Sequence, residues 1–127
     1  AVDALKAASL GIDGVIVSNH GGRQIDGAIS STEALPSIVS AANGNMEVWL
    51  DSGIRSGSDV FKCIALGATG VMIGRPYAMA LACNGEQGII DCINNIMSEL
   101  ELNMALSGCH TINDLNSTLV SHPWKTT

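Results

Sequence analysis

Three short stretches of this sequence carry side chains that could bind an anion or move a proton. The first is SNHGGRQ, residues 18–24, in which a glycine pair separates a histidine from an arginine. The second is DSGIR, residues 51–55, and the third is GRP, residues 74–76. Each stretch follows a run of apolar residues, so we expect each to begin where a buried strand ends.

His20 and Arg23 have the chemistry of an acid–base site for a carboxylic acid. Imidazole groups titrate near neutral pH, which suits a general base, and His20 is the candidate. The planar guanidinium of Arg23 can hold a carboxylate through two parallel hydrogen bonds. Gly21 and Gly22 permit positive φ angles and a close approach of the backbone to a ligand. Taken alone, the stretch could also be a surface loop that contains these side chains by chance.

The DSGIR and GRP stretches have the chemistry of a phosphate site. A glycine-bearing loop after a late barrel strand exposes backbone N–H groups that can bind phosphate. Arg55 and Arg75 would add positive charge. Taken separately, the first stretch could be an ordinary tight turn and the second a simple strand end. Because both follow neighbouring strands, together with the histidine loop, they predict a phosphate site beside an acid–base site.

Three predicted strands place these stretches at one edge of a sheet. Apolar, β-branched runs predict strands at residues 14–18, 46–51 and 70–74, and their character is typical of strands buried on both faces. The segments between them have helical spacing and helix end signals. The predicted helices are residues 1–10, residues 32–42 capped by Thr32, residues 59–66 capped by Ser58, and residues 88–102 with Ile89, Ile93, Ile96, Met97 and Leu100 on the apolar face.

An internal repeat indicates that the strands are parallel. LGIDGVIV at residues 10–17 has a second copy, LGATGVMI, at residues 66–73. Each copy contains a helix end, a glycine, a short turn, a second glycine and a strand, as alternating β and α units do. Three parallel strands predict an open α/β sheet or the last part of a (β/α)8 barrel, which needs roughly 250 residues when complete. In both architectures, ligands bind at the carboxyl ends of the strands.

Composition excludes several classes of protein. The chain has 127 residues, a net charge of −6 and 46% hydrophobic residues, which is typical of a single globular domain. The acidic balance argues against nucleic-acid binding, and the apolar runs are too short to span a membrane. The cysteines lack paired ligand spacing, so we expect no metal site and predict reduced, buried or half-buried thiols in a cytoplasmic protein. The first residues already have a helical pattern, so we expect part of a longer protein.

The motifs resemble those of the FMN-dependent 2-hydroxy-acid oxidases and dehydrogenases, which include glycolate oxidase, lactate oxidase, L-lactate dehydrogenase and mandelate dehydrogenase. The resemblance rests on SNHGGRQIDGA, LDSGIRSGSDVFKCIALGA, VMIGRPY and MALSGC, and it extends over residues 1–115. It implies an α/β fold, the C-terminal part of a TIM (β/α)8 barrel with strands six to eight and the following helices. Residues 1–127 would then be one part of the barrel domain. The resemblance further implies a homo-oligomeric parent protein, a tetramer.

The resemblance also implies a reaction and the residues that perform it. FMN would be the cofactor, and a small L-2-hydroxy acid would be oxidised to the 2-oxo acid. His20 would be the active-site base, Arg23 would hold the substrate carboxylate, and Ser18 would lie beside the flavin. Ser52 stands where many members of the family have glycine, although some dehydrogenases of the family also have serine at this position. The residues implied to bind FMN, mainly through its phosphate, are Ser18, Asp51, Ser52, Gly53, Ile54, Arg55, Gly74 and Arg75.

Two other interpretations remain open at this point. Another phosphate-binding barrel, similar to IMP dehydrogenase, would explain DSGIRSG and IGRP but not SNHGGR. Alternatively, these residues could be an inactive fragment that only associates with other chains. The motifs occur in both oxidases and dehydrogenases, so the electron acceptor and the particular 2-hydroxy acid stay open as well.

Overall fold

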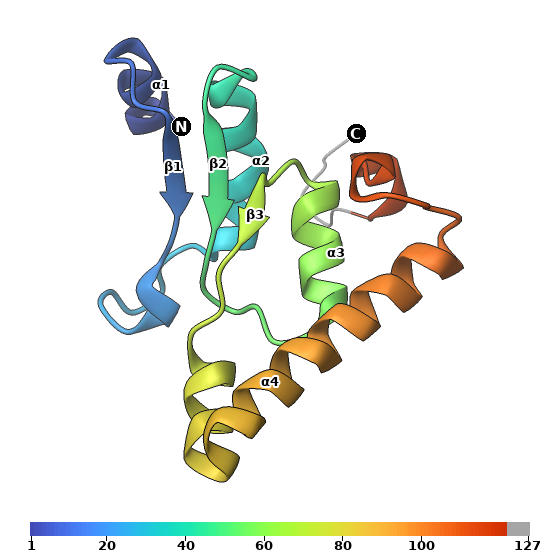
Figure 1. Cartoon of the computed structure of the whole chain (residues 1–127). Helices are drawn as coiled ribbons and strands as arrows, with labels where there is room; N and C mark the ends of the chain where they lie inside the picture. Colours follow the sequence, from blue (N-terminus) through green and yellow to red (C-terminus); the bar gives the residue numbers. More distant parts are fainter. Residues whose placement is uncertain (122–127) are drawn as a thin grey trace.

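The computed structural model describes residues 1–121 and consists of three parallel strands with helices between them (Figure 1). The strands lie in the order β1-β2-β3, and both neighbouring pairs are parallel. The prediction of a parallel α/β arrangement is therefore confirmed. The main elements are α1 (Val2–Ser9), β1 (Gly14–Val17), α2 (Ser31–Ala42), β2 (Glu47–Leu50), α3 (Gly57–Ala65), β3 (Gly70–Val71) and α4 (Arg75–Leu106), with short 3-10 turns at His20–Gly22, Ile112–Asp114 and Ser117–Leu119.

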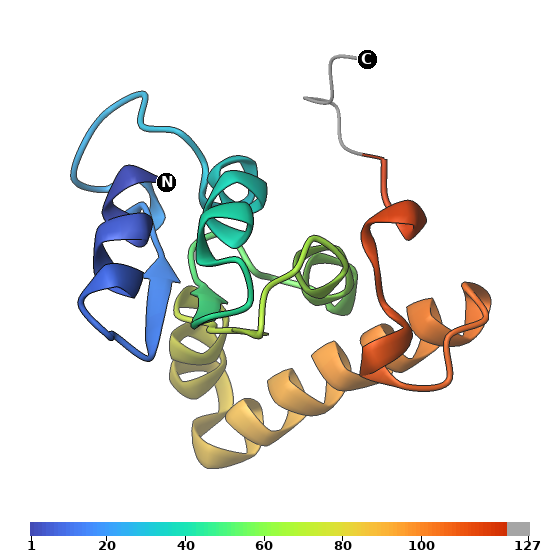
Figure 2. The same ribbon diagram turned by 90° about the horizontal axis from the view of Figure 1, so that it is seen from above.

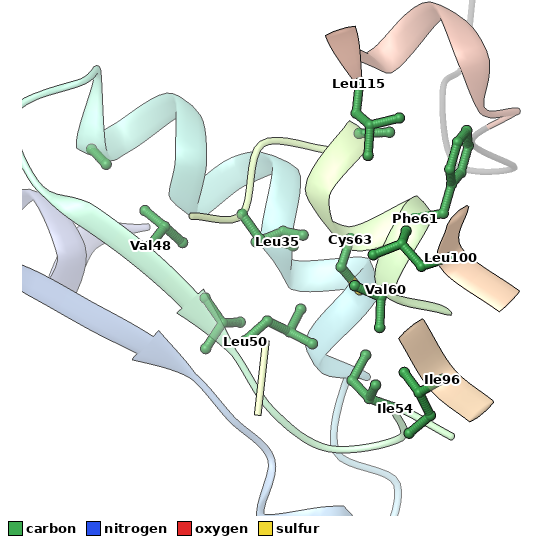
Figure 3. Close-up of a cluster of buried hydrophobic side chains, with 14 of the residues drawn as sticks. Leu35, Val48, Leu50, Ile54, Val60, Phe61, Cys63, Ile96, Leu100 and Leu115 are labelled. Atoms are coloured by element: carbon green, nitrogen blue, oxygen red, sulfur yellow. The ribbon is translucent and has the colours of Figure 1, made fainter. Parts of the chain in front are cut away.

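One face of the sheet is covered by helices and forms the core. Seen from above, α1, α2 and α3 lie on the same side of the strands (Figure 2). Val17 and Leu50 point to this side and are 5% and 0% exposed. The core continues from the sheet through α3 to the far part of α4 (Figure 3). Its labelled members are Leu35, Val48, Leu50, Ile54, Val60, Phe61, Cys63, Ile96, Leu100 and Leu115.

The other face of the sheet is open, so the expectation of strands buried on both faces is wrong for this chain. Successive side chains of a strand point to opposite faces, and Ile16 is paired with Trp49 on the open side. Ile16 is 57% exposed and Met72 is 36% exposed. The physical reason is that the described residues supply helices to one face only. The apolar composition of these strands fits a second layer that residues 1–121 do not contain.

The last helix is longer than the sequence pattern predicted and is broken near its start. α4 begins at Arg75, not at residue 88, and it contains two non-helical residues, Asn84 and Gly85. The break divides α4 into a short first arm below the strand ends and a long second arm that packs on α3 (Figure 1). Of the predicted apolar face, Ile96 and Leu100 are buried, whereas Ile93 and Met97 are about half exposed.

Both predicted helix caps are wrong by two residues. α2 is capped by Ser30, whose hydroxyl accepts a hydrogen bond from the Glu33 amide, and not by Thr32. α3 is capped by Ser56, and not by Ser58. In both places several hydroxyl residues stand close together, and each could satisfy a first-turn amide. Ser30 and Ser56 have the extended backbone conformation that an N-cap residue adopts.

The cysteine prediction is correct in part. Cys63 and Cys109 are buried and Cys92 is half-buried, but Cys83 is exposed at the end of the first arm of α4. Within residues 1–121, no helix combines the length and the apolar character needed to cross a membrane.

Candidate active site at the strand ends

The three predicted stretches lie together at the carboxyl ends of the strands (Figure 1). β1 leads into the histidine loop, β2 leads into the segment before α3, and β3 leads into the start of α4. All of the chain's arginines, Arg23, Arg55 and Arg75, follow these strand ends. A chain with a net charge of −6 therefore collects positive charge at this one edge, which suits anionic ligands.

The histidine loop makes a left-handed turn. His20, Gly21 and Gly22 have φ angles of 55°, 67° and 71°, a region that glycine enters at little cost and other residues rarely adopt. The Ser18 hydroxyl accepts a hydrogen bond from the His20 amide at 3.1 Å. Asn19 Oδ1 accepts one from the Gly22 amide at 3.2 Å. The turn leaves the His20 side chain exposed, where a reactant can reach it.

A serine after β2 connects this loop to the neighbouring strand end. The Gly21 amide donates a hydrogen bond to Ser52 Oγ at 2.9 Å. The Ser52 hydroxyl in turn donates to Asp51 Oδ1 at 2.7 Å. Ser52 and Gly53 both have positive φ angles, of 73° and 93°. The turn after β2 is therefore tightly held on the side that faces the histidine loop.

The third strand end contributes a helix start and an arginine. Gly74 precedes α4 as its N-cap and, having no side chain, leaves the first amides of the helix uncapped from this position. A proline stands in the first turn, where its missing N–H costs nothing. The Arg75 guanidinium lies beside the histidine loop, because a methyl group placed on Gly21 would be 3.9 Å from Arg75 Nη2. All three strand ends therefore meet around Gly21.

The donors at this edge fit a phosphate group. In the described part of the chain, the amides of Gly53 and Gly74 have no hydrogen-bond acceptor, and a Cβ added to either glycine would meet nothing within 4 Å. Free amides at a helix start, with arginine nearby, are the donors that phosphate requires. The neighbouring helix start, that of α3, is already occupied: Ser56 and Asp59 form a capping box there, and Glu99 accepts from the Gly57 amide.

Three predicted site residues are less closely connected to this cluster. Arg23 is exposed, and its amide donates to the His20 carbonyl at 3.4 Å. Arg55 is also exposed, and it lines a concave surface beside the break in α4 together with Asn84 and Asp91. Ile54 is 4% exposed, so its side chain belongs to the core. Only the backbone of Ile54 can face a ligand.

The sequence reasoning missed the helix start at Arg75. The segment GRP predicts a phosphate loop or a strand end, whereas the structure shows that Arg75 and Pro76 form the first turn of a helix. The available signal was Pro76, because proline is favoured in the first turn of a helix. The role of Asn19 as a second acceptor inside the histidine loop was also missed.

Comparison with known proteins identifies the family. A model of the FMN-dependent dehydrogenase family matches residues 1–122. The chain belongs to the FMN-dependent dehydrogenase family. FMN is the cofactor of this family, as the resemblance of the motifs implied. The match includes the SNHGGR stretch, which the alternative of an IMP-dehydrogenase-like barrel left unexplained.

Individual relatives agree with this assignment. The chain is 50% identical over 115 residues to an L-lactate dehydrogenase of Pectobacterium atrosepticum, and the match covers 91% of this chain and 30% of the relative. It is 48% identical over 118 residues to 2-hydroxyacid oxidase 1 of Mus musculus, covering 93% and 32%. A crystal structure of mandelate oxidase with benzoyl-formic acid is 45% identical, with a TM-score of 0.87, and the match covers 90% of this chain and 34% of that one.

The chain therefore spans about a third of the length of the relatives that it matches. The close structural likeness confirms the expectation of a partial TIM barrel. It also explains the open face of the sheet, because the interior of a barrel is filled by side chains from all of its strands.

Proposed function

We propose that this chain is the part of an FMN-dependent oxidoreductase that binds the FMN phosphate and carries the active-site base. The enzyme oxidises an L-2-hydroxy acid to the 2-oxo acid. The observation that carries the proposal is the meeting of the three strand ends around Gly21, through Ser52 on one side and Arg75 on the other. This arrangement supports a base that acts next to a phosphate site.

The phosphate would be held by backbone amides and two arginines. The amides of Ser52, Gly53 and Gly74 supply neutral donors, and Arg55 and Arg75 supply charge-assisted ones. Two further residues of the loop, Asp51 and Ile54, would contribute through the turn that they build, since the Asp51 carboxylate accepts from Ser52 and the Ile54 side chain is buried. When bound, FMN supplies the acceptor for the two electrons that leave the substrate.

The substrate would be oriented and deprotonated by the histidine loop. The Arg23 guanidinium holds the carboxylate, and the His20 imidazole takes the proton from the hydroxy acid. Ser18 keeps the loop in place through its hydrogen bond to the His20 amide, and its position at the end of β1 would place it beside the flavin. Holding the acid at two points next to the base lowers the entropic cost of reaching the reactive geometry.

The identity of the acid and the setting of the enzyme are also proposals. The relatives are named for lactate, mandelate and 2-hydroxy acids in general, so small L-2-hydroxy acids are the proposed substrates. We retain a homotetramer as the proposed assembly. A cytoplasmic location is likewise a proposal, and a relative from Arabidopsis thaliana, 50% identical, is named a peroxisomal (S)-2-hydroxyacid oxidase.

The test compares FMN with riboflavin, which lacks the phosphate. In the full-length enzyme, Arg75→Ala should raise the dissociation constant of FMN about 10- to 100-fold, because a hydrogen bond to a charged group contributes roughly 1.5–3 kcal/mol. Riboflavin affinity should change less than about twofold. Lys6→Ala removes a cation from α1, away from the strand ends, and is the matched control. Equal losses for FMN and riboflavin would show that Arg75 does not bind the phosphate.

A further inference from the structure

We infer that the Ser52 side chain is a positioning residue for His20 and not a ligand of the cofactor. The inference rests on the proposed function, because it takes His20 as the base. It goes beyond that function because it assigns different roles to the backbone amide and the side-chain hydroxyl of Ser52. The Ser52 amide is one of the donors proposed for the phosphate, whereas its hydroxyl oxygen accepts a hydrogen bond from the histidine loop.

The hydrogen bonds of the hydroxyl support this division. A serine hydroxyl has one proton to donate, and Ser52 donates it to Asp51 Oδ1 at 2.7 Å. Its oxygen accepts from the Gly21 amide at 2.9 Å. A phosphate oxygen needs a donor, and the only proton of this hydroxyl is already used by a carboxylate. The negative charge of Asp51 also polarises the hydroxyl and strengthens the bond from Gly21.

The backbone conformation of Ser52 supports a role for its side chain. Its φ angle is 73°, in the left-handed region where a Cβ is unfavourable and glycine is not penalised. Glycine would therefore suit the backbone better at this position. The hydroxyl compensates for the strained turn by joining two loops that are 31 residues apart in the sequence.

The bond acts on His20 through the adjacent peptide group. Two peptide amides flank the His20 Cα. The His20 amide donates to Ser18 Oγ, and the Gly21 amide donates to Ser52 Oγ. Ser18 follows β1 directly, so its bond lies within one strand end and does not connect the loop to another. Ser52 belongs to the next strand end, so its bond connects the residue after His20 to the turn that carries the proposed phosphate donors. Loss of the hydroxyl should therefore misplace the imidazole without removing a donor from the phosphate.

The experiment uses two substitutions that remove the same hydroxyl. In the full-length enzyme with saturating FMN and substrate, Ser52→Ala and Ser52→Gly should each slow flavin reduction about tenfold, as expected for the loss of one hydrogen bond. The dissociation constant of FMN should change less than about twofold. Ser58→Ala, a nearby serine on α3, is the control for loss of a hydroxyl and should change neither quantity.

A double-substitution cycle separates positioning from a general structural effect. If Ser52 acts through His20, adding Ser52→Ala to His20→Gln should slow reduction less than about twofold further, because the affected base is already gone. In addition, the Gly21 amide should exchange its hydrogen faster in Ser52→Ala, as measured by NMR, which does not depend on activity.

The outcomes have distinct meanings. The inference is overturned if Ser52→Ala weakens FMN binding tenfold and leaves reduction unchanged, if its effect persists fully in the His20→Gln background, or if exchange at Gly21 does not change. Failure of the proposed function has a different signature. In that case the enzyme with His20→Gln alone would still show flavin reduction at the normal rate.

Discussion

Replacing Gly57 by alanine should push α3 and α4 apart. A methyl group on the Gly57 Cα would lie 2.5 Å from the Ile96 carbonyl oxygen and 2.6 Å from the Glu99 carbonyl carbon, and it would also overlap the Leu100 amide. These are backbone atoms of α4, so no rotation of a side chain can relieve the overlap. The Gly57 amide also donates to Glu99 Oε2 at 2.8 Å, and a separation of the helices would strain this bond.

The expected loss is about 2–4 kcal/mol in the free energy of unfolding. Overpacking of a close contact costs roughly 1–3 kcal/mol, and a hydrogen bond to a charged group contributes roughly 1.5–3 kcal/mol. Alanine is a better helix former than glycine, which returns at most about 1 kcal/mol. The steric and hydrogen-bond costs therefore exceed the gain in helix propensity, and the net effect is destabilising.

Urea unfolding followed by circular dichroism at 222 nm measures this effect. The control is Ser58→Ala, which introduces alanine at the next position of α3. Its free energy of unfolding should stay within about 0.5 kcal/mol of that of the unchanged protein. Because α4 carries Gly74 and Arg75 at its start, Gly57→Ala should also weaken FMN binding. A Gly57→Ala protein that is as stable as the unchanged one would refute the close packing of α3 on α4.

Four further predictions concern the base, the substrate arginine, a buried thiol and the isolated chain. In the full-length enzyme, His20→Gln should slow flavin reduction by roughly two to four orders of magnitude with FMN still bound; a normal rate in stopped-flow measurements would contradict its role as the base. Arg23→Lys should weaken the binding of oxalate, because lysine lacks the planar fork of the guanidinium; an unchanged oxalate affinity would contradict its role. Burial raises the pKa of the Cys63 thiol to about 11, so iodoacetamide at neutral pH should label the exposed Cys83 first; mass spectrometry that finds Cys63 labelled first would contradict the burial. The stability linked to the Cys63 thiol should be full below pH 9.0 and should fall as the pH rises through 11. Residues 1–127 alone should show no flavin-dependent turnover of glycolate, lactate or mandelate, because the face of the sheet that carries Ile16 is open; turnover above that of a His20→Gln control would contradict this expectation.

The sequence by itself determined the local features of this protein. The repeat of LGIDGVIV and LGATGVMI predicted two helix ends and two strands, and the structure confirms them, with Gly11 and Gly67 both at positive φ. The positions of the three strands and the presence of chemistry after each one were also predictable. The physical reason is that apolar periodicity and the conformational freedom of glycine act over a few neighbouring residues.

The tertiary structure alone decided which of these local features work together. Three helix starts follow the strand ends. Nearby serines cap α2 and α3, and only the tertiary structure shows that distant Glu99 also accepts from the Gly57 amide of α3, whereas within residues 1–121 no side chain caps α4. The bond from Gly21 to Ser52 spans 31 residues and that from Gly57 to Glu99 spans 42. Such pairs leave no periodic signal, because their partners meet only after the strands have paired and α4 has packed on α3. The open face of the sheet has the same origin, since the burial of Ile16 depends on a layer that residues 1–121 do not contain.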